Sequence, residues 1–428
     1  MIRLVRSSNL KMTILCTCAC LAMPWAAQAK DYDLMTSPTL TGDWGGARTS
    51  LNDMGITPYA MYTGQYANAQ SGGARTGDAY AQQIAFGINL DLKKLADLDG
   101  AKFFIGFNAR EGHNTSAYIG NKMAVQSVYG SGENINISNL SYEQSIGKHF
   151  LTQVGFLPLG NAFGYTPLML DFQNSGFYGH PLSLPFDSGW ADYPVAHWGG
   201  LVKFMQGPAY FQTGVFDVNP DVLQHGRGLD MSLDGSTGAI IPIELGLSTK
   251  FGAKALPGIY KIGGYYDTSK APDQVTTSIE RSGRYGGYIL AQQMLISTDK
   301  NNKTGITGFA QFTDNDRETS LITYYVDAGV IYQGPFATRP ADYISLGYVR
   351  AFVNNRKIQA TYSKLMAKDQ LLPDLASGEA VIEAGYSAQV TPWFRVYPNL
   401  QYVINPGAFA LKTTSNAFVF GLSTQVKF

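Results

Sequence analysis

The residue types best suited to binding chemistry are concentrated in the stretch 157–197, which is rich in Pro and Gly. Carboxylates accept hydrogen bonds from hydroxyl groups, and aromatic rings offer flat faces for stacking. Together they suit weak, reversible binding of a neutral, hydroxyl-rich solute. A loop of about forty residues without secondary structure is usually functional. The carboxylates and rings that this stretch supplies include Tyr165, Asp171, Phe172, Phe177, Tyr178, Asp187, Trp190 and Asp192.

A complementary set of donors lies on one alternating segment that follows the tight turn Asp99-Gly100. Lys102, Asn108 and Arg110 share one parity, and in a strand the two parities face opposite sides. If this polar face meets the stretch 157–197, its basic side chains lie across from the acidic side chains of that stretch. The opposite charges would then set an electric field across the space between them, which orders water.

These two sets define the predicted site. We expect Arg110 to donate from the wall, Asp171 and Asp187 to accept from the loop, and Trp190 to be the stacking platform. Two of these residues have an alternative role. Asp171 could simply hold its own loop, and Trp190 could lie in an aromatic belt at a membrane interface. The full predicted site is Lys102, Asn108, Arg110, Asp171, Tyr178, Asp187 and Trp190.

The elements that must position these residues are alternating strands. Between about residues 56 and 428, spans of about ten residues alternate apolar with polar side chains and are separated by turns. In the last span, Phe418, Phe420 and Phe428 share one parity, whereas the other parity is mostly small or polar. The clearest other examples are 84–93, 241–250, 382–390 and 394–402.

This alternation fits either a soluble sandwich that buries its apolar parity or a membrane barrel that turns it to lipid. An export signal, a terminal Phe that assembly machinery reads, and the pairing of short turns with longer loops favour the barrel. We predict an all-β, 16-stranded antiparallel transmembrane β-barrel over residues 56–428. Closure requires an even number of strands, so eighteen is the alternative, and the boundaries between about 285 and 370 are the least defined. Sixteen strands leave an aqueous lumen, into which 157–197 would fold as a constriction loop.

Residues 1–29 have the pattern of a secretory signal peptide. Arg3, Arg6 and Lys11 precede a short apolar run, and Ala27-Gln28-Ala29 offers a cleavage site. Cysteines in this run raise a lipoprotein alternative, but the usual Leu upstream of Cys20 is lacking. All three cysteines lie in this segment, so the chain from residue 30 onward has no disulfide framework.

Composition narrows the classes of function. From residue 30 onward, 29 basic and 32 acidic residues give a net charge of −3, which argues against nucleic acid as a partner. Charged residues make up 15% and aromatic residues 13% of the chain. No stretch after residue 30 approaches the ~18 apolar residues that a membrane helix needs.

Residues 30–55 are predicted to form an N-terminal periplasmic segment with a short helix. Asp43 can cap this helix, Trp44, Leu51 and Met54 share one of its faces, and Gly55 can end it. Such a segment would form a strap against the barrel mouth. A plug or a partner-docking element is the alternative.

Signals for an enzyme are weak. The five His residues show no metal-binding spacing, and neither a G-x-S-x-G nor a G-x-G-x-x-G motif occurs. His180 or His197 could activate Ser183 or Ser188, but the third member of a triad is missing. We therefore expect no enzyme and no cofactor.

Longer motifs resemble a known family. The segment from Ser37 to Arg48, followed by Leu51 and Gly55-Ile56, resembles the opening motif of carbohydrate-selective porins of the OprB type. Further similar segments run in order along nearly the whole chain from residue 30. They are 110–114, 171–174, 179–181, Tyr193-Pro194, Trp198-Gly199 and 401–407.

The resemblance implies a barrel in the outer membrane of a Gram-negative bacterium that admits sugars such as glucose by passive diffusion. Its partners would be lipid, lipopolysaccharide, small neutral sugars and, through Phe428, the barrel-assembly machinery, with a monomer and a trimer both open. Two departures stand out. Leu170 and Tyr178 occupy positions where many relatives carry a cysteine pair, and the last strand offers Gly421 and Ser423 where an Arg is often seen. A general-diffusion porin without sugar selectivity and a structural or adhesive anchor are the alternatives.

Overall fold

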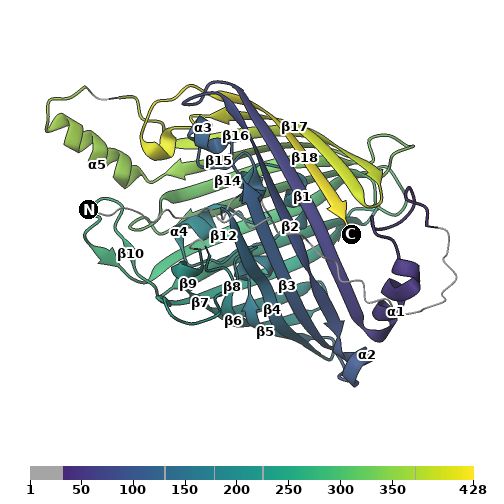
Figure 1. The fold of residues 1–428 in the computed structure, drawn as a ribbon. Helices are drawn as coiled ribbons and strands as arrows, with labels where there is room; N and C mark the ends of the chain where they lie inside the picture. The colour runs from purple at the N-terminus through teal and green to yellow at the C-terminus, as the bar shows by residue number, and fades with distance from the viewer. Residues whose placement is uncertain (1–31, 130–131, 178, 224–225, 372) are drawn as a thin grey trace, which may run out of the picture.

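The computed structural model describes residues 32–129, 132–177, 179–223, 226–371 and 373–428. The predicted signal peptide and Tyr178 lie outside these residues. The described chain forms one closed antiparallel barrel of sixteen strands (Figure 1), which confirms the predicted fold and strand number. The strands are β1 (Ile56–Ser71), β2 (Gly77–Asp91), β3 (Ala101–Gly112), β4 (Asn134–Ile146), β5 (Phe150–Leu157), β6 (His197–Gln206), β7 (Ala209–Val218), β8 (Gly238–Phe251), β9 (Leu256–Asp267), β12 (Arg284–Ser297), β13 (Gly305–Asn315), β14 (Ile322–Gln333), β15 (Tyr343–Val353), β16 (Gly378–Thr391), β17 (Phe394–Ile404) and β18 (Ala417–Lys427).

The barrel closes through its first and last strands. β1 pairs antiparallel with β18, with Gly64 opposite Thr424 and Tyr66 opposite Leu422. Every other neighbouring pair follows chain order, apart from the β9–β12 pair, because the short hairpin β10 (Ala271–Pro272) and β11 (Glu280–Arg281) stands outside the barrel. Closure removes the free sheet edges that would otherwise remain unpaired.

The apolar parity of the strands faces outward. Ile84, Phe86 and Ile243 are 44%, 41% and 51% exposed, whereas their neighbours Gln83 and Glu244 are buried on the inner side. A sandwich would bury the first set and expose the second, so the sandwich alternative is excluded. An outer surface of this kind suits contact with lipid.

The two ends of the barrel differ in their connections. Short connections join the strands at one end, here called the short-turn end, as between β6 and β7 at residues 207–208. Loops of up to about forty residues emerge at the other, the long-loop end, where α5 (Asn355–Met366) and β10 lie (Figure 1). The sequence pattern did not predict α5. Among the described residues, no helix is both long and apolar enough to cross a membrane. The remaining helices are α1 (Ala47–Met54), α2 (Leu92–Ala96), α3 (Ser116–Ile119), α4 (Ser183–Asp187) and the 3₁₀ turns η1 (Trp44–Gly46), η2 (Ser127–Tyr129), η3 (Leu159–Asn161), η4 (Pro167–Asp171), η5 (Ser175–Phe177), η6 (Pro220–Leu223) and η7 (Ala408–Ala410).

The N-terminal segment lies against the short-turn end, beside the C-terminus (Figure 1). Helix α1 ends at Gly55, whose left-handed φ of 95° favours glycine. Asp43 does not directly precede α1, but its carboxylate accepts the backbone N–H of Thr49 at 2.8 Å. Arg48 donates to the backbone oxygen of Phe428 at 3.0 Å. The segment therefore holds the final residue of the chain in place.

Candidate pore constriction

The constriction loop, described over residues 158–177 and 179–196, enters the barrel and is fixed by carboxylates of the wall. Both oxygens of Glu383 on β16 accept backbone N–H groups of the loop, from Gln173 at 2.7 Å and from Asn174 at 2.8 Å. Glu244 on β8 accepts the N–H of Gly164 at 2.7 Å. Charge-assisted bonds of this kind are stronger than neutral ones. They hold a loop that has no cysteine in its sequence.

Asp187 provides the reverse connection, from the loop to the wall. Its carboxylate accepts the backbone N–H groups of Leu321, at 2.6 Å, and of Ile322. Burial raises the pKa of Asp187 to about 8, and the N–H groups of Ile322 and Leu321 oppose that rise. The structure thus places Asp187 at an anchor of the loop rather than at an open surface.

A second loop, described over residues 113–129, also packs into the lumen. Glu379 on β16 accepts the backbone N–H groups of Lys122, at 2.8 Å, and of Met123, at 2.7 Å. Gln126 donates to the backbone oxygen of Gln65 on β1 at 2.8 Å. The sequence pattern did not predict this second inward loop.

Two apolar clusters fill the space between the constriction loop and the wall. In one, Phe172 and Phe177 stack at 4.4 Å between ring centroids. In the other, Trp190 packs edge-on against Tyr265 and Tyr288. Burial of such large rings stabilises the loop by the hydrophobic effect and by aromatic packing. Trp190 is only 3% exposed, so it does not lie in an aromatic belt at a membrane interface.

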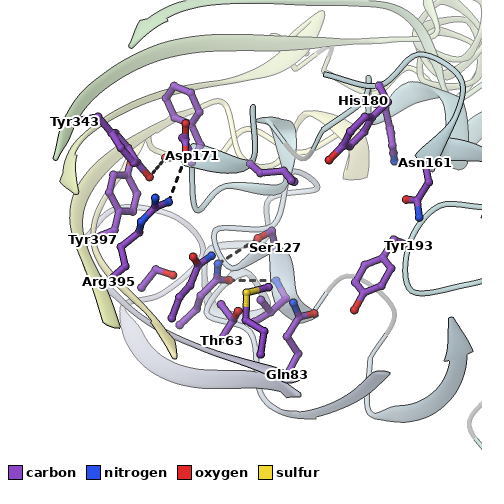
Figure 2. Close-up of a pocket in the computed structure, with 18 residues that line it drawn as sticks. Thr63, Gln83, Ser127, Asn161, Asp171, His180, Tyr193, Tyr343, Arg395 and Tyr397 are labelled. Carbon is purple, nitrogen blue, oxygen red and sulfur yellow. Dashed lines mark hydrogen bonds and ion pairs between the residues drawn. The ribbon is translucent and has the colours of Figure 1, made fainter. Parts of the chain in front are cut away.

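A cavity of about 450 Å³ remains open between the loops and one side of the wall (Figure 2). Its polar side chains come from β1, β2, β15, β17 and β18 and from both inward loops. Its lining residues are Met61, Thr63, Gln65, Gln83, Ser127, Val128, Asn161, Tyr165, Leu170, Asp171, Phe172, His180, Tyr193, Tyr343, Arg395, Tyr397, Ser423 and Gln425.

Arg395 and Asp171 form an ion pair in this cavity (Figure 2). Nη1 of Arg395 on β17 lies 3.5 Å from Oδ1 of Asp171 on the loop. The Arg395 guanidinium also lies 5.2 Å from the ring centroid of Tyr343. Burial raises the pKa of Asp171 to about 6, and the charge of Arg395 opposes the rise. A cation, an anion and an aromatic face therefore meet in one open space.

Arg110 and Asn108 lie one layer behind this cavity. Both are buried and donate to the same oxygen, Oε1 of Gln83, at 3.2 Å from Arg110 and at 3.3 Å from Asn108. Asn108 also donates to the hydroxyl of Tyr193 at 2.7 Å. Because Gln83 and Tyr193 line the cavity and the other two do not, Arg110 and Asn108 support the surface from behind.

Four of the predicted site residues lie away from this cavity or cannot be placed. Asp187 and Trp190 are buried between the loop and the wall and do not line it. Lys102 is half exposed and pairs with Glu143 at 3.5 Å near the short-turn end of β3. Eight residues separate it from Arg110, which corresponds to about 27 Å along an extended strand. Tyr178 lies outside the described residues. The structure therefore brings together Asn108 and Arg110, with Asp171 on the cavity that they support, and leaves Lys102 apart.

The comparisons decide the family. The model described as "Carbohydrate-selective porin, OprB family" matches residues 75–428. The chain belongs to this family. It is similar to Porin B of Pseudomonas aeruginosa, at 33% identity over 94% of each chain. It is also similar to the Putative porin QuiX of Acinetobacter baylyi, at 28% identity over 94% of this chain and 95% of that protein. The high-pH structure of Pseudomonas putida OprB has a TM-score of 0.87 at 30% identity, covering 93% of this chain and all of that one.

Membership of the carbohydrate-selective porins confirms the resemblance found in the sequence motifs. Porins are channels rather than enzymes, and the family and the barrel together place the protein in a bacterial outer membrane. Within the described residues, no cluster of three or more His, Cys, Asp or Glu side chains could hold a metal ion.

The sequence reasoning missed Arg395 as a residue of this porin's cavity. Its position on the polar parity of 394–402 was evident, but nothing marked it above other inward residues. Arg395 lies opposite Gln425 of β18 in the sheet. It thus supplies a guanidinium on the strand next to the one that lacks an inward Arg.

Proposed function

We propose that this porin lets small neutral sugars such as glucose cross the outer membrane of a Gram-negative bacterium by passive diffusion, and that selection takes place in the 450 Å³ cavity. The observation that carries the proposal is the Arg395–Asp171 pair among tyrosine rings inside the lumen. Sugar-biased diffusion agrees with membership of the carbohydrate-selective porins.

The chemistry of the cavity matches that of a monosaccharide. A sugar ring presents hydroxyl groups at its rim and less polar faces above and below. The Arg395 guanidinium can donate to two neighbouring hydroxyls, and the Asp171 carboxylate can accept from others. The ring of Tyr165 or Tyr193, each part-exposed and lining the cavity, offers a face against which the sugar can stack. A channel needs such contacts to be weak enough for release.

Arg110 contributes through its neighbours. Its bond to Gln83, together with that of Asn108, fixes the amide of Gln83 at the cavity surface. Its charge adds positive potential behind that wall. We assign Arg110 and Asn108 as positioning residues, and Arg395 and Asp171 as the residues that touch the solute.

Liposome swelling tests the proposal. Liposomes containing the native porin should take up glucose faster than triethylene glycol, a neutral non-sugar of similar size. Arg395→Gln should reduce this advantage of glucose. Arg350→Gln is the matched control, because Arg350 on β15 stacks on Phe352 and does not line the cavity. Equal uptake rates of the two solutes by the native porin would instead favour a general-diffusion porin.

Single-channel recording separates a pore from a structural or adhesive anchor. A porin inserted in a planar bilayer gives stepwise conductance, whereas an anchor gives none. The same preparation, sized in detergent, distinguishes a monomer from a trimer.

Recognition of Phe428 by the assembly machinery predicts that Phe428→Ala lowers the amount of folded barrel in the outer membrane without changing the conductance of the barrels that form.

A further inference from the structure

Three aromatic rings follow one another on the outer face of the barrel, near the long-loop end. They belong to Phe312 on β13, Tyr324 on β14 and Phe352 on β15, and each lies within three residues of the end of its strand. The Phe312 and Tyr324 rings stack at 6.1 Å between centroids, and the Tyr324 and Phe352 rings meet edge-on at 6.4 Å. We call these three residues the ring ladder. Aromatic side chains gather at this depth in membrane barrels, where acyl chains give way to headgroups.

Arg350 lies beside the ring ladder on the same outer face. The preceding outward residues of β15 are exposed and apolar or aromatic, and the arginine interrupts them. In order, these outward residues are Ile344, Leu346, Tyr348, Arg350 and Phe352. The guanidinium carbon of Arg350 lies 4.5 Å from the Phe352 ring centroid, and Nη2 donates to the Ser377 hydroxyl at 2.9 Å. A cation on the lipid side of a barrel costs least near the headgroups, so Arg350 places the ring ladder near a membrane surface.

Arg317 lies over the middle ring of the ladder. It belongs to the connection between β13 and β14 and is exposed. Its guanidinium carbon lies 5.1 Å from the Tyr324 ring centroid, and Nη2 donates to the Tyr324 hydroxyl. Within the part of the chain that the structure describes, neither Arg317 nor Arg350 forms an ion pair with a carboxylate. The rings hold two guanidinium groups whose charges are not compensated by a bound carboxylate.

The nearby acidic side chains restrict where an anion can lie. Glu318 lies 3.4 Å from Nε of Arg281, and the Asp316 carboxylate accepts hydrogen bonds from its own connection. Asp314 on β13 is exposed, lies opposite Tyr324 in the sheet, and makes no ion pair among the described residues. An anion would be repelled on that side of the ladder. It would therefore lie toward β15, where both guanidinium groups are in reach.

The partner that fits this surface combines an anionic group with acyl chains. A guanidinium binds phosphate through two parallel N–H bonds, and it can do so while its face stacks on an aromatic ring. Longer loops face the outside in barrels of this class, so the ring ladder meets the outer leaflet of the membrane. Phosphorylated headgroups would contact the arginines, and the attached acyl chains would contact the exposed apolar residues of the same strands. A free anion would gain nothing from that apolar surface.

We propose that the ring ladder, with Arg317 and Arg350, binds the phosphate groups of lipid A, the membrane anchor of lipopolysaccharide. The site lies on the outside of the barrel and is separate from the pore cavity, so it does not depend on the proposed sugar diffusion. Its role is to hold a lipid at a fixed position on β13 to β15.

Native mass spectrometry of the delipidated porin, titrated with lipid A, tests this site. The native porin should retain lipid A in a saturable way. Arg317→Gln and Arg350→Gln should each raise the half-saturating concentration about tenfold, the effect of losing one charge-assisted hydrogen bond. Asp314→Asn should lower it, because this exchange removes a charge that repels phosphate. Lipid A stripped of its phosphate groups should bind the native porin at least tenfold more weakly.

Arg227→Gln is the matched control for the loss of one positive charge. Arg227 lies in the connection between β7 and β8, at the same end of the barrel, but it pairs with Asp221 and Asp230. This variant should bind lipid A as the native porin does. A loss equal to that of the two ladder variants would mean that net charge alone attracts the lipid, which overturns the site.

Three other results would also overturn the site. They are native affinity in both ladder variants, equal binding of lipid A with and without its phosphate groups, and retention of inorganic phosphate in place of the lipid. Glucose swelling in liposomes made without lipid A leaves this site empty, so Arg350→Gln reports there only on the pore. Normal glucose uptake without specific lipid A binding would remove this site and leave the proposed function intact.

Discussion

Two sides of the barrel wall carry an inward arginine, and they use it differently. Arg395 on β17 lines the open cavity and pairs with Asp171. Arg110 on β3 is 3% exposed, donates to Gln83, and makes no ion pair among the described residues. Its Nη2 has no hydrogen-bond partner. The same side chain on the same inner face is therefore a surface group at one position and a supporting group at the other.

The inward loops produce this difference. Tyr193 of the constriction loop accepts from Asn108, and Ser127 of the second loop accepts from Gln65, so the loops contact the wall at β3 and β1. At β17 the loop instead presents the Asp171 carboxylate to an open space. Strand parity decides which face a residue occupies, and the loops decide which of the inner residues reach water.

Releasing the constriction loop should give the largest effect. Glu383→Ala leaves the backbone N–H groups of Gln173 and Asn174 without their acceptor, at a cost of about 1–3 kcal/mol for each. We expect single-channel conductance to rise several-fold. We also expect the difference in solvent exposure between Arg395 and Arg110 to diminish. Chymotrypsin should cut the loop, which has many aromatic residues and no Lys or Arg.

Glu383→Gln is the control for this change. Its amide oxygen can accept one of the two N–H groups, but its NH₂ group cannot accept the other. Conductance should therefore fall between those of the native porin and Glu383→Ala. An unchanged conductance in Glu383→Ala would mean that the apolar clusters alone fix the loop.

The second prediction compares the two arginines directly. Arg395→Gln should lower glucose uptake about tenfold, since a charge-assisted hydrogen bond contributes about 1.5–3 kcal/mol. Arg110→Gln should change uptake by no more than about twofold, because Gln83 and Tyr193 still form the cavity surface. Both rates come from swelling assays at equal amounts of folded barrel. Equal losses in the two variants would remove the distinction between a solute contact and a supporting residue.

Much of the fold could be predicted from the sequence, because each strand must satisfy lipid on one side and water on the other. Parity alone assigns Ile84 to the outer face and Gln83 to the inner face, as the structure has them. The site could be predicted only in part. Asp171 was named and lines the cavity, but Asp187 accepts backbone groups of Leu321 and Ile322 that are more than 130 residues away in the chain. Such pairings depend on the path of the loop, which has no periodicity to reveal it.

The third prediction concerns the effect of pH on the Arg395 side of the wall. The pKa of Asp171 is about 6, above its ordinary 3.8, so this carboxyl becomes neutral as the pH falls below about 6. Arg395 then loses its counter-charge, and the cavity gains one positive charge. Selectivity for chloride over potassium should increase between pH 8 and pH 5, with a midpoint near 6. Asp171→Asn should show the acid-form selectivity throughout, whereas a midpoint that persists in this variant would assign the step to another group.

The same shift has a defined sign for stability. Because the folded pKa of Asp171 lies above its unfolded value of 3.8, the folded barrel binds this proton more tightly. The contribution of Asp171 to the free energy of unfolding is therefore fully present below pH 3.8 and is lost as the pH rises through about 6. Protonation of Asp171 in acid should therefore change the ion selectivity of the pore. The same protonation should not release the constriction loop from the wall. Chymotrypsin cleavage of the native porin at pH 8 and pH 5.5, normalised to the activity of the protease on a peptide at each pH, should show no increase at the lower pH.

The smallest effect is expected from one hydroxyl group at the open cavity. The Tyr343 hydroxyl donates to the backbone oxygen of Asp171 at 3.2 Å, while its ring lies beside the Arg395 guanidinium. Tyr343→Phe keeps the ring and removes the bond, at a cost of about 0.5–1.5 kcal/mol. Glucose uptake should fall by about two- to threefold, with the chloride selectivity little changed because both charges remain. If stacking rather than hydrogen bonding positions Arg395, Tyr343→Leu should lower uptake further than Tyr343→Phe. Equal rates in these two variants would assign the whole effect of Tyr343 to its hydroxyl group and remove the aromatic platform from the account of this wall.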